Sequence, residues 1–160
     1  MKISANEEYG LRIVLCIATF QSTKPSELVS LNQIAEAEGI SPEYTASIIS
    51  LLKSAKIVES VRGKNGGYRL SRTPEEINLY QVINALSDKP FASGFCDSHT
   101  GIMERCMHSE NCSIRPVWTY ITDLLDQFFN QISLSELMRK EGEVKDIVNE
   151  NMIRVVETIK

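Results

Sequence analysis

The sequence lacks the apolar segments and motifs that mark membrane proteins and many enzymes. Its apolar run from Tyr9 to Phe20 is interrupted by Arg12 and is too short to cross a bilayer. Glu7 and Glu8 precede this run where a signal peptide would be basic, so we expect a cytoplasmic protein that does not contact membranes. GxGxxG, GxxxxGK[ST], GxSxG and HExxH are all absent, and neither histidine has an evident triad context. The sequence therefore predicts neither an enzyme nor a small-molecule substrate.

Cysteine is scarce, with four residues in the chain, Cys16, Cys96, Cys106 and Cys112. Because the chain otherwise resembles an intracellular protein, we do not expect a disulfide framework. Cys16 lies among apolar residues, which favours a buried and inert thiol. The other three fall in one turn-rich segment, where metal or redox chemistry is the better use for them.

Excess positive charge is also lacking, since the net charge is −4 at pH 7, but the charges are unevenly distributed. Residues 1–73 carry nine basic and seven acidic residues, whereas residues 74–160 carry eight and fourteen. Between residues 41 and 73, six basic residues stand against two acidic ones. The six are Lys53, Lys56, Arg62, Lys64, Arg69 and Arg72. This segment predicts either a phosphate-facing surface or an ordinary solvated basic surface.

Three helices are expected in the first third of the chain, at residues 4–21, 31–39 and 41–56. Apolar residues recur in them at helical spacing, and Gly39 is placed as a terminating glycine. Ser41 and Pro42 suit the start of the third helix. A short helix, a tight glycine turn and a longer helix together indicate a helix-turn-helix.

A basic hairpin is predicted directly after these helices. Residues 57–61 and 68–71 read as strands, and Asn65-Gly66 between them is a strong hairpin signal because both residues tolerate positive φ. A hairpin in this position is what a DNA-binding wing looks like. The predicted fold class is therefore mainly α with a small β-hairpin wing.

The remainder of the chain is expected to be helical on both sides of the cysteine segment. A short helix is predicted at residues 75–86, and Pro116 opens a long helix with one apolar stripe. The stripe comprises Val117, Ile121, Leu124, Leu125, Phe128, Phe129 and Ile132. The length of this stripe favours burial against the same helix of a second copy, so we expect a homodimer. An amphipathic tail is expected at residues 143–160. The predicted domains are a winged helix-turn-helix at 1–90, a cysteine-bearing loop at 91–115, and a dimerisation helix with its tail at 116–160.

Three chemistries are open for the cysteine loop. Loop thiols can converge on an iron-sulfur cluster, with the fourth ligand coming from elsewhere. Zinc could use Cys96, Cys106, His108 and Cys112, although Cys106-x5-Cys112 is wider than the usual zinc ligand pair. A reversible thiol-disulfide switch without metal is the third possibility.

Several segments of the chain resemble the IscR, NsrR, RirA and RsrR family of winged-helix iron-sulfur regulators. They are Met1–Ser4, Glu8–Arg12, Gln33–Glu36, Ile40–Tyr44, Leu51–Lys53, Val61–Tyr68 and Cys106–Trp118. The arginine, the paired glycines and the tyrosine of the predicted wing are the most specific part of the match. The resemblance implies a dimeric DNA-binding regulator, a repressor, that senses redox state, nitric oxide or iron status through an iron-sulfur cluster.

The resemblance also implies a ligand set for a cluster near the base of the dimer helix. Relatives take the fourth ligand from a histidine three residues after the last cysteine, here Arg115, or from an acidic residue of the partner's first helix. The implied ligands are therefore Cys96, Cys106, Cys112 and, donated across the dimer, Glu8. The gap of nine residues between the first two cysteines is longer than in many relatives. The sequence does not decide between [2Fe-2S] and [4Fe-4S].

A DNA-binding face follows from the helix-turn-helix and wing. We expect the third helix to present side chains to the major groove and phosphates, and the wing to reach the adjacent minor groove of a palindromic operator. The residues assigned to this face are Ser41, Glu43, Tyr44, Ser47, Lys53, Arg62, Lys64 and Asn65.

Overall fold

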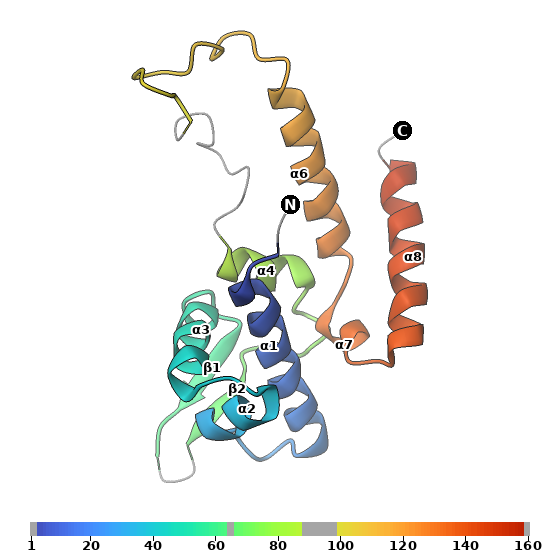
Figure 1. The fold of residues 1–160 in the computed structure, drawn as a ribbon. Helices are drawn as coiled ribbons and strands as arrows, with labels where there is room; N and C mark the ends of the chain where they lie inside the picture. The colour runs from blue at the N-terminus through green and yellow to red at the C-terminus, as the bar shows by residue number, and fades with distance from the viewer. Residues whose placement is uncertain (1–2, 64–65, 88–98, 159–160) are drawn as a thin grey trace.

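The computed structural model describes residues 3–63, 66–87 and 99–158 and is mainly helical (Figure 1). The elements are α1 (Ala5–Thr23), α2 (Leu31–Glu38), α3 (Pro42–Ser54), β1 (Val58–Val61), β2 (Gly67–Leu70), α4 (Leu79–Leu86), α6 (Arg115–Asn130), α7 (Leu134–Leu137) and α8 (Glu141–Thr158). The predicted fold class, helical with a small hairpin and a long C-terminal helix, is confirmed. None of the described helices combines the length and hydrophobicity needed to cross a bilayer.

Side-chain caps set the starts of the first helices. The Ser4 hydroxyl accepts a hydrogen bond from the Glu7 amide in a capping box at α1, and Ser41 caps α3 ahead of Pro42. Gly39 ends α2 with φ of 67°, a left-handed conformation that favours glycine. The predicted helix-turn-helix is therefore present with the expected turn residue.

The hairpin pairs β1 with β2 in an antiparallel ladder, with Val58 opposite Leu70. A third segment joins it, because Val29 exchanges both backbone hydrogen bonds with Tyr68, at 3.2 and 2.8 Å. The sequence analysis did not predict this bridge. Gly67 allows it, since a Cβ there would lie 2.7 Å from the Val29 carbonyl oxygen. The wing is thereby tied to the chain that enters α2.

One hydrophobic core lies beneath the helix-turn-helix and the hairpin. Helix α1 contacts α2, α3, α4 and β2. The side chains that bury most completely there are Ile13, Val14, Ile17, Ile34, Ile48, Leu52, Ile57, Ile77 and Val82. Gly10 lets α4 approach α1, because a Cβ at this position would overlap the side chain of Leu86. Helix α1 is therefore the central element against which the DNA-binding helices are fixed.

The helix predicted at residues 75–86 begins later than expected, at Leu79. The Glu76 carboxylate accepts hydrogen bonds from the Thr73 amide and hydroxyl at 3.1 and 3.2 Å, which closes a turn instead of starting a helix. Asn78 then caps α4 with an extended backbone. The first part of the prediction was wrong because Pro74 begins a turn.

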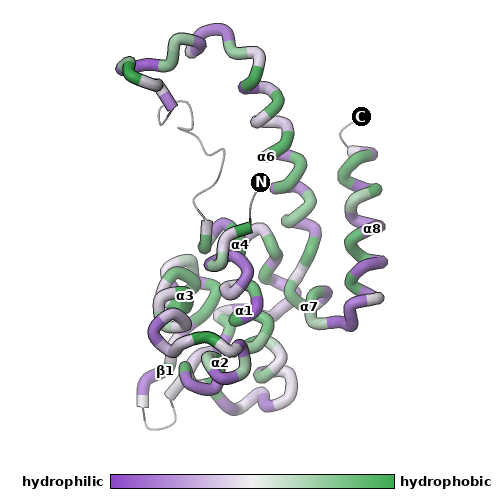
Figure 2. The backbone as a smooth tube through the Cα atoms, viewed as in Figure 1, coloured by the Kyte–Doolittle hydropathy of each residue, from purple (hydrophilic) through white to green (hydrophobic). Residues whose placement is uncertain are grey.

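The C-terminal helices extend from this core, and α6 projects well beyond it (Figures 1 and 2). Ile132 was predicted as the last residue of the α6 stripe, but it lies after the helix, 1% exposed, and its carbonyl accepts the Leu79 amide at 2.8 Å. The predicted tail forms α8, which packs on α6 and α7 with Val155 fully buried.

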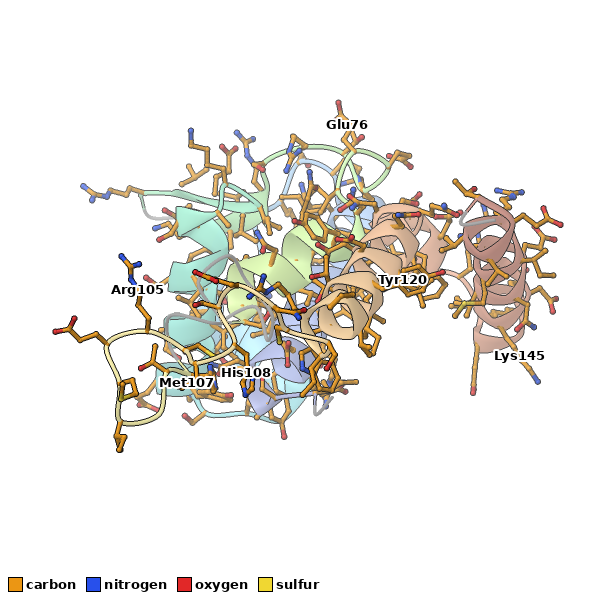
Figure 3. All side chains as sticks on the ribbon, turned by 90° about the horizontal axis from the view of Figure 1, so that it is seen from above. Glu76, Arg105, Met107, His108, Tyr120 and Lys145 are labelled. Carbon is orange, nitrogen blue, oxygen red and sulfur yellow. The ribbon has the colours of Figure 1, made fainter. Side chains whose placement is uncertain are left out.

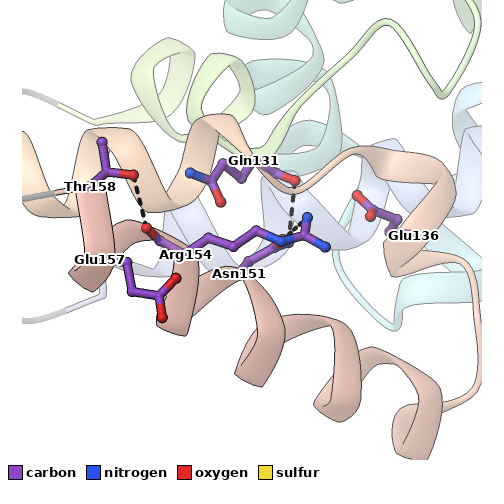
Figure 4. Close-up of a pocket in the computed structure, with 6 residues that line it drawn as sticks. All are labelled: Gln131, Glu136, Asn151, Arg154, Glu157 and Thr158. Carbon is purple, nitrogen blue, oxygen red and sulfur yellow. Dashed lines mark hydrogen bonds between the residues drawn. The ribbon is translucent and has the colours of Figure 1, made fainter.

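A polar pocket of about 620 Å³ lies where α6, α7 and α8 meet (Figure 4). Asn151, 4% exposed, donates from Nδ2 to the Gln131 carbonyl at 3.3 Å. Its Oδ1 accepts from Arg154 Nη1 at 3.5 Å. These bonds attach α8 to the end of α6 and satisfy the polar side chain that is buried there.

Candidate DNA-binding surface and cysteine loop

Four of the eight residues predicted to contact DNA lie on the outer side of α3 or at its N-cap. Ser41, Glu43, Ser47 and Lys53 are all exposed. The Ser41 hydroxyl accepts the Tyr44 amide at 3.2 Å, and the Ser47 hydroxyl donates to the Tyr44 carbonyl at 2.8 Å. Both hydroxyls therefore stabilise the first turns of α3 and still face the outer side of the helix.

Tyr44 occupies a different position from these residues. It is half-buried, and its hydroxyl donates to Oδ1 of Asn6 on α1 at 2.7 Å. Its ring meets that of Tyr9 edge to face, with centroids 5.8 Å apart. The sequence analysis missed Asn6, because the two residues are 38 positions apart and no local pattern links them.

A second contact between α1 and the helix-turn-helix is made by Arg12. Its Nε lies 2.8 Å from Glu38 Oε2, and its Nη2 donates to the Glu38 carbonyl at 2.9 Å, at the end of α2. The guanidinium also lies 5.3 Å from the centre of the Tyr9 ring. Helix α1 therefore contacts the last residue of α2 and the first turn of α3 through neighbouring side chains.

Cys16 is half-buried beside Glu38, where a buried thiol was predicted. Burial raises the pKa of the Cys16 thiol, and the nearby Glu38 carboxylate, which accepts its hydrogen bond, raises that pKa further. The neutral thiol is favoured, in agreement with the expectation of low reactivity.

The hairpin presents fewer free positive charges than its sequence suggests. Arg62 is exposed at the end of β1. Arg69 on β2 pairs across the ladder with Glu59 on β1, so its charge is compensated within the hairpin. Lys64 and Asn65, the predicted tip of the wing, lie outside the described residues.

Two of the three cysteines of the loop lie in the described part of the chain. Cys106 and Cys112 are free and half-buried, whereas Cys96 lies outside the described residues. His108 is exposed in the same loop (Figure 3). Among residues 3–63, 66–87 and 99–158, no group of three or more histidine, cysteine or acidic side chains is close enough to hold a metal ion.

Arg115, the first residue of α6, organises this loop. Its Nη2 donates to the Ser109 carbonyl at 2.6 Å and to the His108 carbonyl at 3.4 Å. Both carbonyls lie between Cys106 and Cys112, so the guanidinium ties the segment that carries the two thiols to the start of α6. The family resemblance gives Arg115 only as the position where relatives carry a histidine, and this role in the loop was not predicted.

Glu8, the predicted fourth ligand, is exposed in the first turns of α1. Residues 99–114, the described part of the cysteine loop, lie at one end of the molecule before α6, and strands β1 and β2 lie at the other (Figure 1). The structure therefore separates Cys106 and Cys112 from the two strands and leaves Glu8 accessible to another chain.

The sequence model of the Rrf2 family, described as an iron-dependent transcriptional regulator, matches residues 3–140 of this chain. The chain belongs to the Rrf2 family. The HTH-type transcriptional regulator IscR of Aliivibrio salmonicida is 33% identical over 147 residues, which cover 92% of this chain and 82% of the relative. Protein rrf2 of Nitratidesulfovibrio vulgaris is 32% identical over 87% of this chain and 88% of its own. Like them, this Rrf2 protein is a DNA-binding transcription regulator, and its relatives are regulators, not enzymes.

Solved structures support the same fold for this Rrf2 protein. T. potens IscR matches with a TM-score of 0.67 and 25% identity, covering 86% of both chains. CymR of B. subtilis, named as a global cysteine regulator, matches with a TM-score of 0.65 and 27% identity, covering 86% of this chain and 96% of its own. The winged helix and the C-terminal helix are thus shared with regulators of different named roles.

Proposed function

We propose that this protein is a homodimeric regulator that binds a palindromic promoter site through α3 and the hairpin. The observation that carries this proposal is the exposed outer face of α3, with Glu43, Ser47 and Lys53 on it and Ser41 at its N-terminal end. Arg62 extends this face onto the hairpin, and Lys64 and Asn65 continue it by sequence.

A comparison of two arginines tests this surface. Arg62→Ala should weaken binding to all DNA sequences alike and reduce the slope of log affinity against log salt by about one, because one phosphate contact is lost. Arg69→Ala is the matched control, since Arg69 already pairs with Glu59 in the same hairpin. Fluorescence anisotropy with promoter DNA at several salt concentrations measures both. A change in base preference for Arg62→Ala, or equal salt slopes for wild type and both variants, would contradict this role. Lys64→Ala is expected to behave as Arg62→Ala does.

We further propose that the cysteine loop holds an iron-sulfur cluster, with Cys106, Cys112 and Cys96 as thiolate ligands and Glu8 of the partner subunit as the fourth. The donor chemistry fits, because two free thiols lie in one loop that Arg115 ties to α6. When bound, the cluster would supply a charge that changes with redox state. The residues of this chain would hold it beside the start of the dimer helix.

Anaerobic purification with iron and sulfide analysis tests the cluster. Cys106→Ala should give colourless protein. Cys16→Ala should keep the visible absorption, because Cys16 bonds Glu38 and neither residue belongs to the cysteine loop. Wild-type absorption in Cys106→Ala would remove Cys106 from the ligand set. Zinc in place of iron, or no metal in any preparation, would overturn the cluster and leave a zinc-bound or metal-free thiol module.

A further inference from the structure

We propose that Asn6 on α1 is a positioning residue for DNA binding, which acts by holding Tyr44 and with it the first turn of α3, and that Tyr44 donates no hydrogen bond to DNA. The proposal rests on the DNA-binding face described above and is independent of the cluster. It replaces the earlier expectation that Tyr44 reads DNA directly. The observation that supports it is the hydrogen bond of 2.7 Å between Tyr44 Oη and Asn6 Oδ1.

The hydroxyl of Tyr44 has a single proton to donate. DNA phosphate oxygens are acceptors, so Tyr44 could bind one only by donating its proton. That proton already goes to the side-chain carbonyl oxygen of Asn6, and both residues are half-buried. Direct binding to phosphate would therefore require the Asn6 bond to break.

The N-terminal end of α3 is held by contacts on its inner face and by α1. Thr45, Ile48 and Leu52 are buried along the inner face of the helix and set its depth on the core. Around the first turn, the Tyr44 ring packs against Tyr9 and its hydroxyl binds Asn6. The rotation of this turn about the helix axis is thus fixed by α1.

Helix α1 is a rigid frame for this contact. Its packing against α4 is close at Gly10, one residue after Tyr9. Arg12, one turn further along, bonds the last residue of α2. Because Arg12 holds α2 separately, losing the Asn6 bond loosens the first turn of α3 without releasing α2. The apparent affinity for DNA then falls with the fraction of molecules whose α3 is correctly oriented.

A double-mutant cycle tests the proposal in the full-length protein. Asn6→Ala and Tyr44→Phe should each weaken promoter binding about three- to tenfold, the usual net effect of one hydrogen bond. The double variant should be no weaker than either single variant, because both remove the same bond. Circular dichroism and thermal melting check that all variants are folded.

Two further variants separate positioning from general destabilisation. Asn6→Asp keeps the acceptor oxygen, so Tyr44→Phe should again cost about three- to tenfold in this background, although the added charge lowers absolute affinity. Thr19→Ala is the control and should bind DNA like the wild type, because Thr19 is exposed in the last turns of α1, at the other end of the helix from Asn6. A loss for Tyr44→Phe without one for Asn6→Ala would show a direct DNA contact and overturn the proposal. Independent, additive losses, or wild-type binding in both single variants, would also overturn it.

Discussion

Glu38 is shared between two side chains of α1, the guanidinium of Arg12 and the thiol of Cys16. The ion pair joins α1 to the end of α2, while the carboxylate disfavours a second negative charge on the adjacent sulfur. Burial is the larger cause of the raised pKa of Cys16, and Glu38 adds to it in the same direction. The residue that fixes the helix-turn-helix therefore also keeps this thiol protonated.

Glu38→Gln should lower the pKa of Cys16, because it removes the negative charge that opposes the thiolate. The reacting species is the thiolate, so the pH profile of Cys16 alkylation should move to lower pH. Mass spectrometry of the peptide that contains Cys16, after timed iodoacetamide labelling between pH 7 and pH 10, measures the profile. Glu36→Gln is the control, since Glu36 is exposed on the same helix. A profile that stays in place or moves to higher pH would contradict the role of Glu38.

At the scale of the elements, the turn between α2 and α3 depends on one backbone conformation. Gly39→Ala should lower the free energy of unfolding by about 1 to 2 kcal/mol, because a Cβ is strained at its φ of 67°. Urea denaturation followed by circular dichroism measures the change. Gly142→Ala is the control, since no atom lies within 4 Å of a Cβ placed there and alanine is the better helix former. Equal stability of the two variants would argue against strain at Gly39.

Most helices could be predicted because their signals are local. Ser41, Pro42 and Gly39 act within one turn of the boundary that they set. The start of α4 could not be predicted in the same way, because the apolar period continues through Ile77 while the Glu76 carboxylate closes a turn. The bridge between Val29 and Tyr68 depends on tertiary contact and produces no periodic pattern in the sequence.

In the candidate site too, the features with local signals could be predicted and those that depend on tertiary contacts could not. The exposed residues of α3 follow from helical spacing, since the buried positions occupy the opposite face. The Asn6 bond to Tyr44 and the Arg12 pair with Glu38 join residues more than 25 positions apart, so only the packing of α1 on the motif brings them together. The role of Arg115 was missed because its partners are backbone carbonyls, which no side-chain pattern reveals.

Arg115→Ala should loosen the cysteine loop, because two carbonyls between Cys106 and Cys112 lose their donor. Amide hydrogen exchange of the peptide that spans residues 106–114 should become faster in the metal-free protein. Arg105→Ala, in the same loop, is the control for loss of positive charge (Figure 3). Unchanged exchange in Arg115→Ala would show that the loop is held by other contacts.

At the scale of the whole molecule, α6 is a helix whose apolar side a single chain does not bury. It carries a continuous apolar stripe, yet none of its residues is buried in the single chain. Val117, Trp118 and Tyr120, in the first turns of α6, are 52%, 38% and 55% exposed. A stripe of this kind on a helix that projects from the core is the expected surface for a second copy.

Val117→Glu should therefore weaken the proposed dimer, since it places a carboxylate where an apolar side chain would be buried. Burial of one large apolar side chain contributes roughly 1.5 to 3 kcal/mol, so the dimer dissociation constant should rise about tenfold or more. Sedimentation velocity over a range of concentrations measures it, and affinity for a palindromic site should fall more than affinity for a half-site. Thr119→Glu is the matched control, because it adds the same charge two residues further on, about 200° around the helix. If both variants sedimented like the wild type, the apolar stripe of α6 would not be the dimer interface.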